Sequence, residues 1–179
     1  MISHITSAWR RFARDESGNT NTVAFAIWTP VLLITLATAL EVGVYTARAT
    51  MLERGMDITV RDIRLNTGTN PQHNEIKEMI CEQAAIIPNC NNTLRLEMMI
   101  REMRDFAAIP NNADCTDRAL PASPVREFSA GHENELMVLR ACAKIEPIFP
   151  MTWLASALST DAAGDYAVVA LSAFVQEPR

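Results

Sequence analysis

The residues best suited to chemistry in this 179-residue chain are four cysteines: Cys81, Cys90, Cys115 and Cys142. An even number of cysteines, all beyond the apolar N-terminal region, is typical of disulfides formed in an oxidising space such as a bacterial periplasm. No Cys-x-x-Cys pair occurs, which argues against a zinc ribbon or a thioredoxin-like redox pair. Four cysteines allow three pairings, and some of them could be free buried thiols. We favour Cys81–Cys90 with Cys115–Cys142, because the first bridge closes a short loop.

Patterns for catalysis are missing from the sequence. There is no Gly-x-Ser-x-Gly, no Walker loop and no Gly-x-Gly-x-x-Gly. The three histidines, His4, His73 and His132, are scattered, and none is followed by another histidine three or four residues later. We therefore expect a protein that is not an enzyme and that carries no metal or other cofactor.

Two residues stand out within the most apolar part of the chain, Pro30 and Glu41. No charged side chain occurs from Ser17 to Leu40, and the segment 23–45 supplies the ~20 mostly apolar residues that a helix needs to cross a bilayer. Pro30 removes a helix hydrogen bond and usually bends a helix. Glu41 is costly in lipid unless it is solvated or paired. We expect Glu41 either at interfacial depth or in contact with another anchor helix of an assembly.

The flanks of this segment predict its orientation. Arg10, Arg11 and Arg14 precede it, so the positive-inside rule places the N-terminus in the cytoplasm. A cleaved secretory signal would have a shorter apolar core of ~7–15 residues. We therefore expect a single-pass protein of a bacterial inner membrane, with a leader over 1–18, a transmembrane helix over 19–46 and a periplasmic domain over 47–179.

The charge balance excludes one class of partner. The formal net charge is −5, from sixteen basic and twenty-one acidic residues. No run of five or six basic residues occurs, so we expect no nucleic-acid binding.

The elements of the outer domain follow from periodicity. The helix should continue to about residue 66, because apolar residues recur every three or four positions along one face: Ala49, Leu52, Met56, Val60 and Ile63. A second helix is expected over 71–86. Strands are expected over 94–101, 136–145 and 165–175, with a long loop at 106–134 and a short helix or turn within 147–160. Helices first and strands afterwards predict an α+β domain, with a small antiparallel sheet against which the long helix packs.

The N-terminal region resembles a known family. Arg10 to Gly18 reads Arg-Arg-Phe-Ala-Arg-Asp-Glu-Ser-Gly, and Val23 to Pro30 reads Val-Ala-Phe-Ala-Ile-Trp-Thr-Pro, followed by a Glu-Val-Gly stretch that begins at Glu41. This pattern is similar to the start of TadE/TadF-like pilus assembly proteins, which are pseudopilins of the tight-adherence (Flp) pilus. The family typically shows Asp-Glu-x-Gly, then Val-Glu-Phe-Ala, an intramembrane proline and a Glu-x-Gly. The match covers residues 10–43, and the helical stretch 51–65 also looks like members of the family.

The resemblance implies a processing site and a set of partners. A prepilin-type peptidase would cut after Gly18, so that the mature chain begins at Asn19. The anchor, including Pro30 and Glu41, would contact the lipid bilayer, other pilin-like subunits and the pilus assembly machinery. The implied role is biogenesis of an adhesive pilus.

One position departs from the family pattern. Ala24 stands where the family carries a glutamate, which in pilins is thought to neutralise the N-terminal amine of a neighbouring subunit. The resemblance therefore implies a minor component, at initiation or at the tip, and not a repeating subunit. The alternative is a solitary membrane-anchored periplasmic binding module that never enters a pilus.

Overall fold

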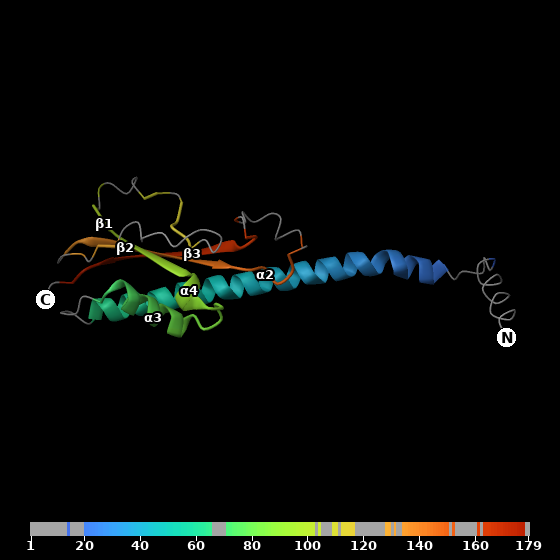
Figure 1. Cartoon of the computed structure of the whole chain (residues 1–179), viewed down its shortest axis with the longest axis horizontal. Coiled ribbons are helices and arrows are strands. Elements are labelled where there is room, and N and C mark those ends of the chain that lie inside the picture. Colours follow the sequence, from blue (N-terminus) through green and yellow to red (C-terminus); the bar gives the residue numbers. More distant parts are fainter. Residues whose placement is uncertain are drawn as a thin grey trace. The chain divides into compact units, whose positions relative to one another are not determined.

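The fold of the described residues is α+β, as the sequence predicts. The computed structural model describes residues 14, 20–65, 71–102, 104, 109–110, 112–116, 128–129, 131, 134–150, 152, 161 and 163–177. In chain order the elements are α2 (Thr20–Leu65), α3 (His73–Gln83), α4 (Cys90–Thr93), β1 (Leu94–Arg101), β2 (Leu136–Ile145) and β3 (Tyr166–Val175) (Figure 1). The expected processing residues Gly18 and Asn19 lie outside the described residues, as does nearly all of the segment 147–160 beyond Pro150.

The chain divides into two compact units, Met1–Ala37 and Thr38–Arg179, and helix α2 contributes residues to both. The helix contains Pro30, and several of its threonines donate their hydroxyls to backbone carbonyl oxygens of the preceding turn. Thr29 Oγ1 donates to the carbonyl oxygen of Phe25 at 2.7 Å, and Thr35 Oγ1 does the same to that of Leu32 at 2.8 Å. Such bonds satisfy the hydroxyl groups within the helix, so these threonines are compatible with an apolar environment around the helix.

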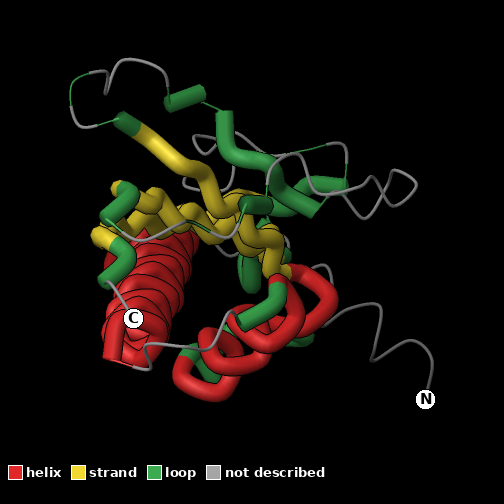
Figure 2. The backbone as a smooth tube through the Cα atoms, turned by 90° about the vertical axis from the view of Figure 1, so that its left-hand side faces the viewer, coloured by secondary structure: helices red, strands yellow, loops and turns green. Residues whose placement is uncertain are grey.

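The sheet of the second unit is antiparallel, in the order β1-β2-β3. Ala141 at the middle of β2 pairs with Leu96 on one side and with Ala170 on the other. Alternation along the strands therefore directs one set of side chains toward the helices. Figure 2 shows the strands lying over α2, with α3 beside it.

The core of this unit lies between that sheet face and the two helices. The predicted stripe on α2 is buried, and Leu52 and Met56 are among its most enclosed members. Ile76 and Ile80 of α3 join the same cluster, together with residues from all three strands. The amphipathic half of α2 is thus the central helix of the second unit, as the periodicity indicates.

Helix α3 packs closely against α2 at Gly55. A Cβ at this position would lie 3.0 Å from the carbonyl oxygen of Ile80 and 3.5 Å from Cβ of Gln83. A larger side chain would force the two helices apart, because packed interiors leave little free space.

Strand β1 is buried on both of its faces. Leu94, Leu96 and Met98 face the core, and Glu97 and Met99 on the opposite face are also buried. Residues of the segment 109–116 cross that face, so β1 is covered on both sides.

The end of one helix and the presence of another differ from the sequence prediction. Helix α3 ends at Gln83 rather than near residue 86, because Ala84 caps it and the chain then turns through Ile87, whose N–H donates to the Ala84 carbonyl oxygen at 3.0 Å. The short helix α4 was not expected. It follows Asn89, which adopts the left-handed conformation with φ 49° that asparagine tolerates better than most residues.

We expect Gly55→Leu to lower the free energy of unfolding by about 1–3 kcal/mol, the usual range for overpacking a core. Gly43→Leu is the matched control, because a Cβ there would meet nothing within 4 Å. Chemical unfolding of the disulfide-intact chain in detergent measures both. Equal losses for the two variants would contradict the close approach of α2 and α3.

Candidate functional site

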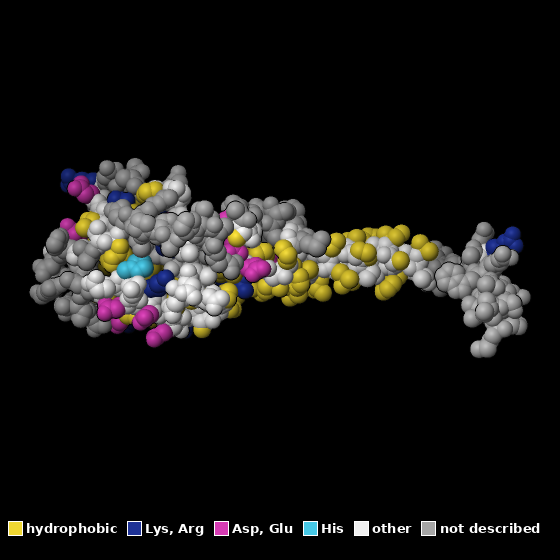
Figure 3. Space-filling view, in the orientation of Figure 1, with side chains coloured by type: hydrophobic (Ala, Val, Ile, Leu, Met, Phe, Trp, Pro, Cys, Tyr) yellow, Lys and Arg dark blue, Asp and Glu magenta, His cyan; other side chains and the backbone are white. Residues whose placement is uncertain are grey.

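The first half of α2 exposes apolar side chains on all its sides. Within the described residues it is the one helix long and apolar enough to cross a membrane, with a mean hydropathy of 2.1 over its most apolar window. Figure 3 shows the hydrophobic side chains that cover this part of the helix. Its largest exposed members include Phe25, Trp28 and Leu32. An apolar surface of this extent is unfavourable in water and marks a membrane or protein contact.

Glu41 follows this surface and is buried within the second unit. Its side chain is 1% exposed. Its two carboxylate oxygens accept hydrogen bonds from the backbone N–H groups of Ile148 at 3.2 Å and Phe149 at 2.9 Å. The chain therefore supplies donors that the sequence did not indicate, and the carboxylate is satisfied without a second molecule. A contact of Glu41 with another anchor helix stays a prediction.

Tyr45 and Arg48, one to two turns after Glu41 on α2, form a cluster with Tyr166 of β3. Arg48 Nη1 donates to the hydroxyl oxygen of Tyr166 at 2.8 Å, and the Tyr45 and Tyr166 rings meet edge to face at 5.4 Å. Burial raises the pKa of Tyr166, although the neighbouring Arg48 opposes that shift. Tyrosine and arginine are enriched where membrane proteins leave the bilayer, because each combines an apolar stem with a polar end.

The connection between β2 and β3 is also tied down at its far end. Asp161 accepts hydrogen bonds from Lys144 Nζ at 2.7 Å and from the backbone N–H groups of Ala163 and Asp165. Burial raises the pKa of Asp161, but these hydrogen bonds and the Lys144 charge outweigh it, so the pKa lies below the usual range. Gly164 completes the turn at φ +83°, a conformation that favours glycine.

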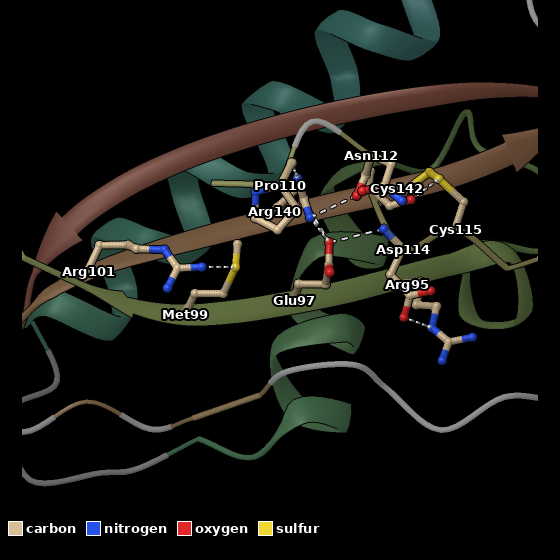
Figure 4. Close-up of polar contacts among 11 residues, drawn as sticks. Arg95, Glu97, Met99, Arg101, Pro110, Asn112, Asp114, Cys115, Arg140 and Cys142 are labelled. Atoms are coloured by element: carbon tan, nitrogen blue, oxygen red, sulfur yellow. Dashed lines mark hydrogen bonds and ion pairs between the residues drawn. A yellow bond between two sulfur atoms is a disulfide. The ribbon is translucent and has the colours of Figure 1, made fainter. Parts of the chain in front are cut away.

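A buried ion pair occupies the sheet face opposite α2 (Figure 4). Register places Glu97 of β1 directly opposite Arg140 of β2, and both side chains are nearly inaccessible to solvent. Arg140 Nε donates to Glu97 Oε2 at 2.6 Å, and its two terminal nitrogens donate to the carbonyl oxygens of Pro110 and Asn112 at 2.6 and 3.2 Å. The Asp114 N–H donates to the same carboxylate of Glu97 at 3.1 Å. The pair thus holds the segment 109–114 against the sheet.

Both disulfides act as further staples in the pairing that the sequence favours. Cys115–Cys142 joins the end of that same segment to β2, with Cα atoms 5.2 Å apart. Cys81–Cys90 joins α3 to α4, with Cα atoms 5.6 Å apart. These bonds restrict the unfolded chain and so stabilise a small outer domain.

Ligand sites are few in the part of the chain that the structure describes. No group of three or more His, Cys, Asp or Glu residues there could hold a metal ion. A groove of about 310 Å³ between α2 and α3 has mixed lining, with Ile58 and Met79 beside Arg61 and Glu82. Such a groove offers a surface for contact but no constellation of catalytic groups.

No family model, no curated protein and no solved structure matches the chain.

Sequence reasoning located some of these residues and missed others. It singled out Glu41, the cysteines and Pro30, and the structure places Glu41 in a buried hydrogen-bonded position. It missed Glu97 and Arg140, although each charge stands between two apolar residues of an expected strand, and opposite charges on neighbouring strands were a signal of pairing. It also gave no role to Ile148 and Phe149.

Arg140→Met and Glu97→Met should each lower the free energy of unfolding by about 3–5 kcal/mol, because each leaves the other charge buried and unpaired. The double variant should lose much less than the sum, since no uncompensated charge remains. Denaturant unfolding of the four proteins measures the coupling. Additive losses would show that the two side chains do not form one buried unit.

Proposed function

We propose that this protein is a TadE-like minor pseudopilin of an adhesive, tight-adherence pilus, anchored in a bacterial inner membrane with its outer domain in the periplasm. The observation that carries the proposal is the division of α2 into an exposed apolar half and an amphipathic half that forms the core of the outer domain. The resemblance of residues 10–43 to the family supplies the kind of assembly.

The physical support is that one helix can serve both roles of such a subunit. Its apolar half would lie in lipid before assembly and against like helices afterwards, since both surroundings accept exposed apolar side chains. The continuous helix ties that half covalently to the folded domain outside. The Glu41 carboxylate already has two hydrogen-bond donors within the chain, so it is compatible with lipid and with neighbouring helices.

Two features fit the domain to an extracytoplasmic location. The disulfides Cys81–Cys90 and Cys115–Cys142 are stable in oxidising compartments. Arg10, Arg11 and Arg14 on the other side of the apolar segment favour a cytoplasmic N-terminus.

The role of a minor subunit rests on Ala24. A repeating subunit would bring many N-terminal amines next to the position that Ala24 occupies, and an alanine cannot neutralise them. A subunit at initiation or at the tip has fewer such neighbours. If the protein never enters a pilus, the alternative is an anchored binding module, for which the groove beside Arg61 and Glu82 is the surface to examine.

Mass spectrometry of the mature N-terminus should find Asn19 in cells that make pili. Gly18→Val should leave the leader attached, because a β-branched residue would block the cleavage position. Recovery of an intact Met1 from wild-type, piliated cells would exclude processing by a prepilin-type peptidase.

Deletion of the gene should reduce the number of surface pili, and the purified pili of wild-type cells should contain small amounts of the protein. Immunoblots of sheared pili, with an inner-membrane protein as the contamination control, measure incorporation. Unchanged pili in the deletion strain, together with sheared pili free of the protein, would contradict the assembly role and favour the binding module.

A further inference from the structure

A small apolar surface surrounds the buried carboxylate of Glu41. Leu40 and Val42, its neighbours on α2, are exposed at 54% and 43%, and Ile148 is exposed at 50%. Phe149 is exposed at 36%. We call these four residues the collar: Leu40, Val42, Ile148 and Phe149. They belong to one compact unit, so their proximity does not depend on the first half of the helix.

The hydrogen bonds to Glu41 fix where the loop part of the collar lies. Both donors are consecutive backbone N–H groups, so the carboxylate holds Ile148 and Phe149 at the level of its own helical turn. Thr152 closes the loop by donating its N–H and its hydroxyl to the Phe149 carbonyl oxygen, at 3.1 and 2.9 Å. The N–H groups of Ile148 and Phe149 and the carbonyl oxygen of Phe149 are therefore satisfied, while the two side chains are exposed.

We propose that the collar is a second membrane contact, in which Ile148 and Phe149 insert into the outer interfacial layer of the bilayer beside α2. The proposal rests on α2 spanning that bilayer, as in the proposed function. Leu40 is the last residue of the uncharged segment, so the collar begins at the residue where that segment ends.

The composition of the loop favours lipid over water as the occupant. From Pro147 to Thr160 the sequence contains no charged residue, and it includes Trp153, a residue type enriched at membrane interfaces. The charges return at Asp161, where Lys144 ties the chain back to the sheet. The connection carries no charge and starts next to Glu41, at the end of the anchor. This is the level at which amphipathic segments lie in the headgroup region of a bilayer.

The residues next to the collar are also of types that are common at a membrane–water interface. Tyr45 and Arg48 lie one to two turns further along α2, and both contact Tyr166 at the start of β3, through an edge-to-face ring contact and a hydrogen bond. At ~1.5 Å per residue, Arg48 is about 10 Å beyond Glu41 along the helix, which is outside the hydrocarbon but within the headgroup layer. The collar therefore sets how deep the outer domain sits.

The test uses the full chain, reconstituted in phosphatidylcholine–phosphatidylglycerol vesicles, with one introduced cysteine that carries an environment-sensitive fluorophore. The four native cysteines are in disulfides and do not react. Ile148→Cys is the test position, and Leu171→Cys is the matched control, because Leu171 is 52% exposed on β3. Leu171 lies five residues beyond Tyr166, about 17 Å along the strand from the Glu41 end of the sheet. Leu32→Cys, within the apolar half of α2, reports whether the helix is in the bilayer.

We expect the probe at 148 to emit at shorter wavelength than the probe at 171 and to lose intensity when nitroxide-labelled lipids are added. Addition of Glu41→Ala should reduce the loss at 148, because the loop is no longer held at that depth, and leave the loss at 32 unchanged.

Three outcomes overturn the proposal. A probe at 148 that resembles the probe at 171, with the probe at 32 quenched, places the collar in water while the anchor stands. A shift to shorter wavelength at 148 without quenching by lipid means that protein, such as a second copy of the chain, covers the collar. An unquenched probe at 32 removes the anchor itself and with it the proposed function.

Discussion

The structure depends on one helix that meets two different surroundings. The residues of α2 up to Leu40 expose apolar side chains on all sides, whereas those from Leu52 to Ile63 bury a single stripe against the sheet and α3. A helix satisfies its own backbone hydrogen bonds in either surrounding, so the backbone can continue unchanged while the side chains change their partners. Everything else in the outer domain is arranged around that fixed spine.

Glu41 lies where the two surroundings meet, and its hydrogen bonds explain where Ile148 and Phe149, just after β2, are placed. A buried carboxylate without donors would be strongly unfavourable, so the chain must bring polar hydrogens to it. It does so with backbone N–H groups at Ile148 and Phe149 rather than with a basic side chain. Two backbone donors leave the side chains of the loop free to be apolar, which a lysine or arginine partner would not have allowed.

The sheet face opposite α2 is shielded from water in a different way. A short antiparallel sheet needs cover on both faces or a polar outer face. Here the cover is the segment 109–116, held by the Arg140–Glu97 pair and by the bridge between Cys115 and Cys142. The buried charges specify where the segment lies, and the disulfide makes that position permanent.

How far the sequence predicts this structure depends on the range of the interaction. The bounds of β1 and β2 agree with the expected segments, because alternation and turn residues are local signals. The helical stripe from Leu52 to Ile63 is equally local. The donors to Glu41 and the contacts of Arg140 with Pro110 and Asn112 were not predictable, since they depend on the positions of loop residues, which periodicity does not encode. Burial of β1 on both faces was missed for the same reason.

The Glu41 hydrogen bonds also have a consequence for the order of folding. Their donors lie 107 and 108 residues later in the chain, so the carboxylate has no such partners until β2 has formed and delivered Ile148 and Phe149. Helix α2 can form earlier, because its backbone hydrogen bonds join residues only four positions apart. The Glu41 carboxylate is therefore satisfied last, which couples the burial of this turn of the helix to completion of the sheet.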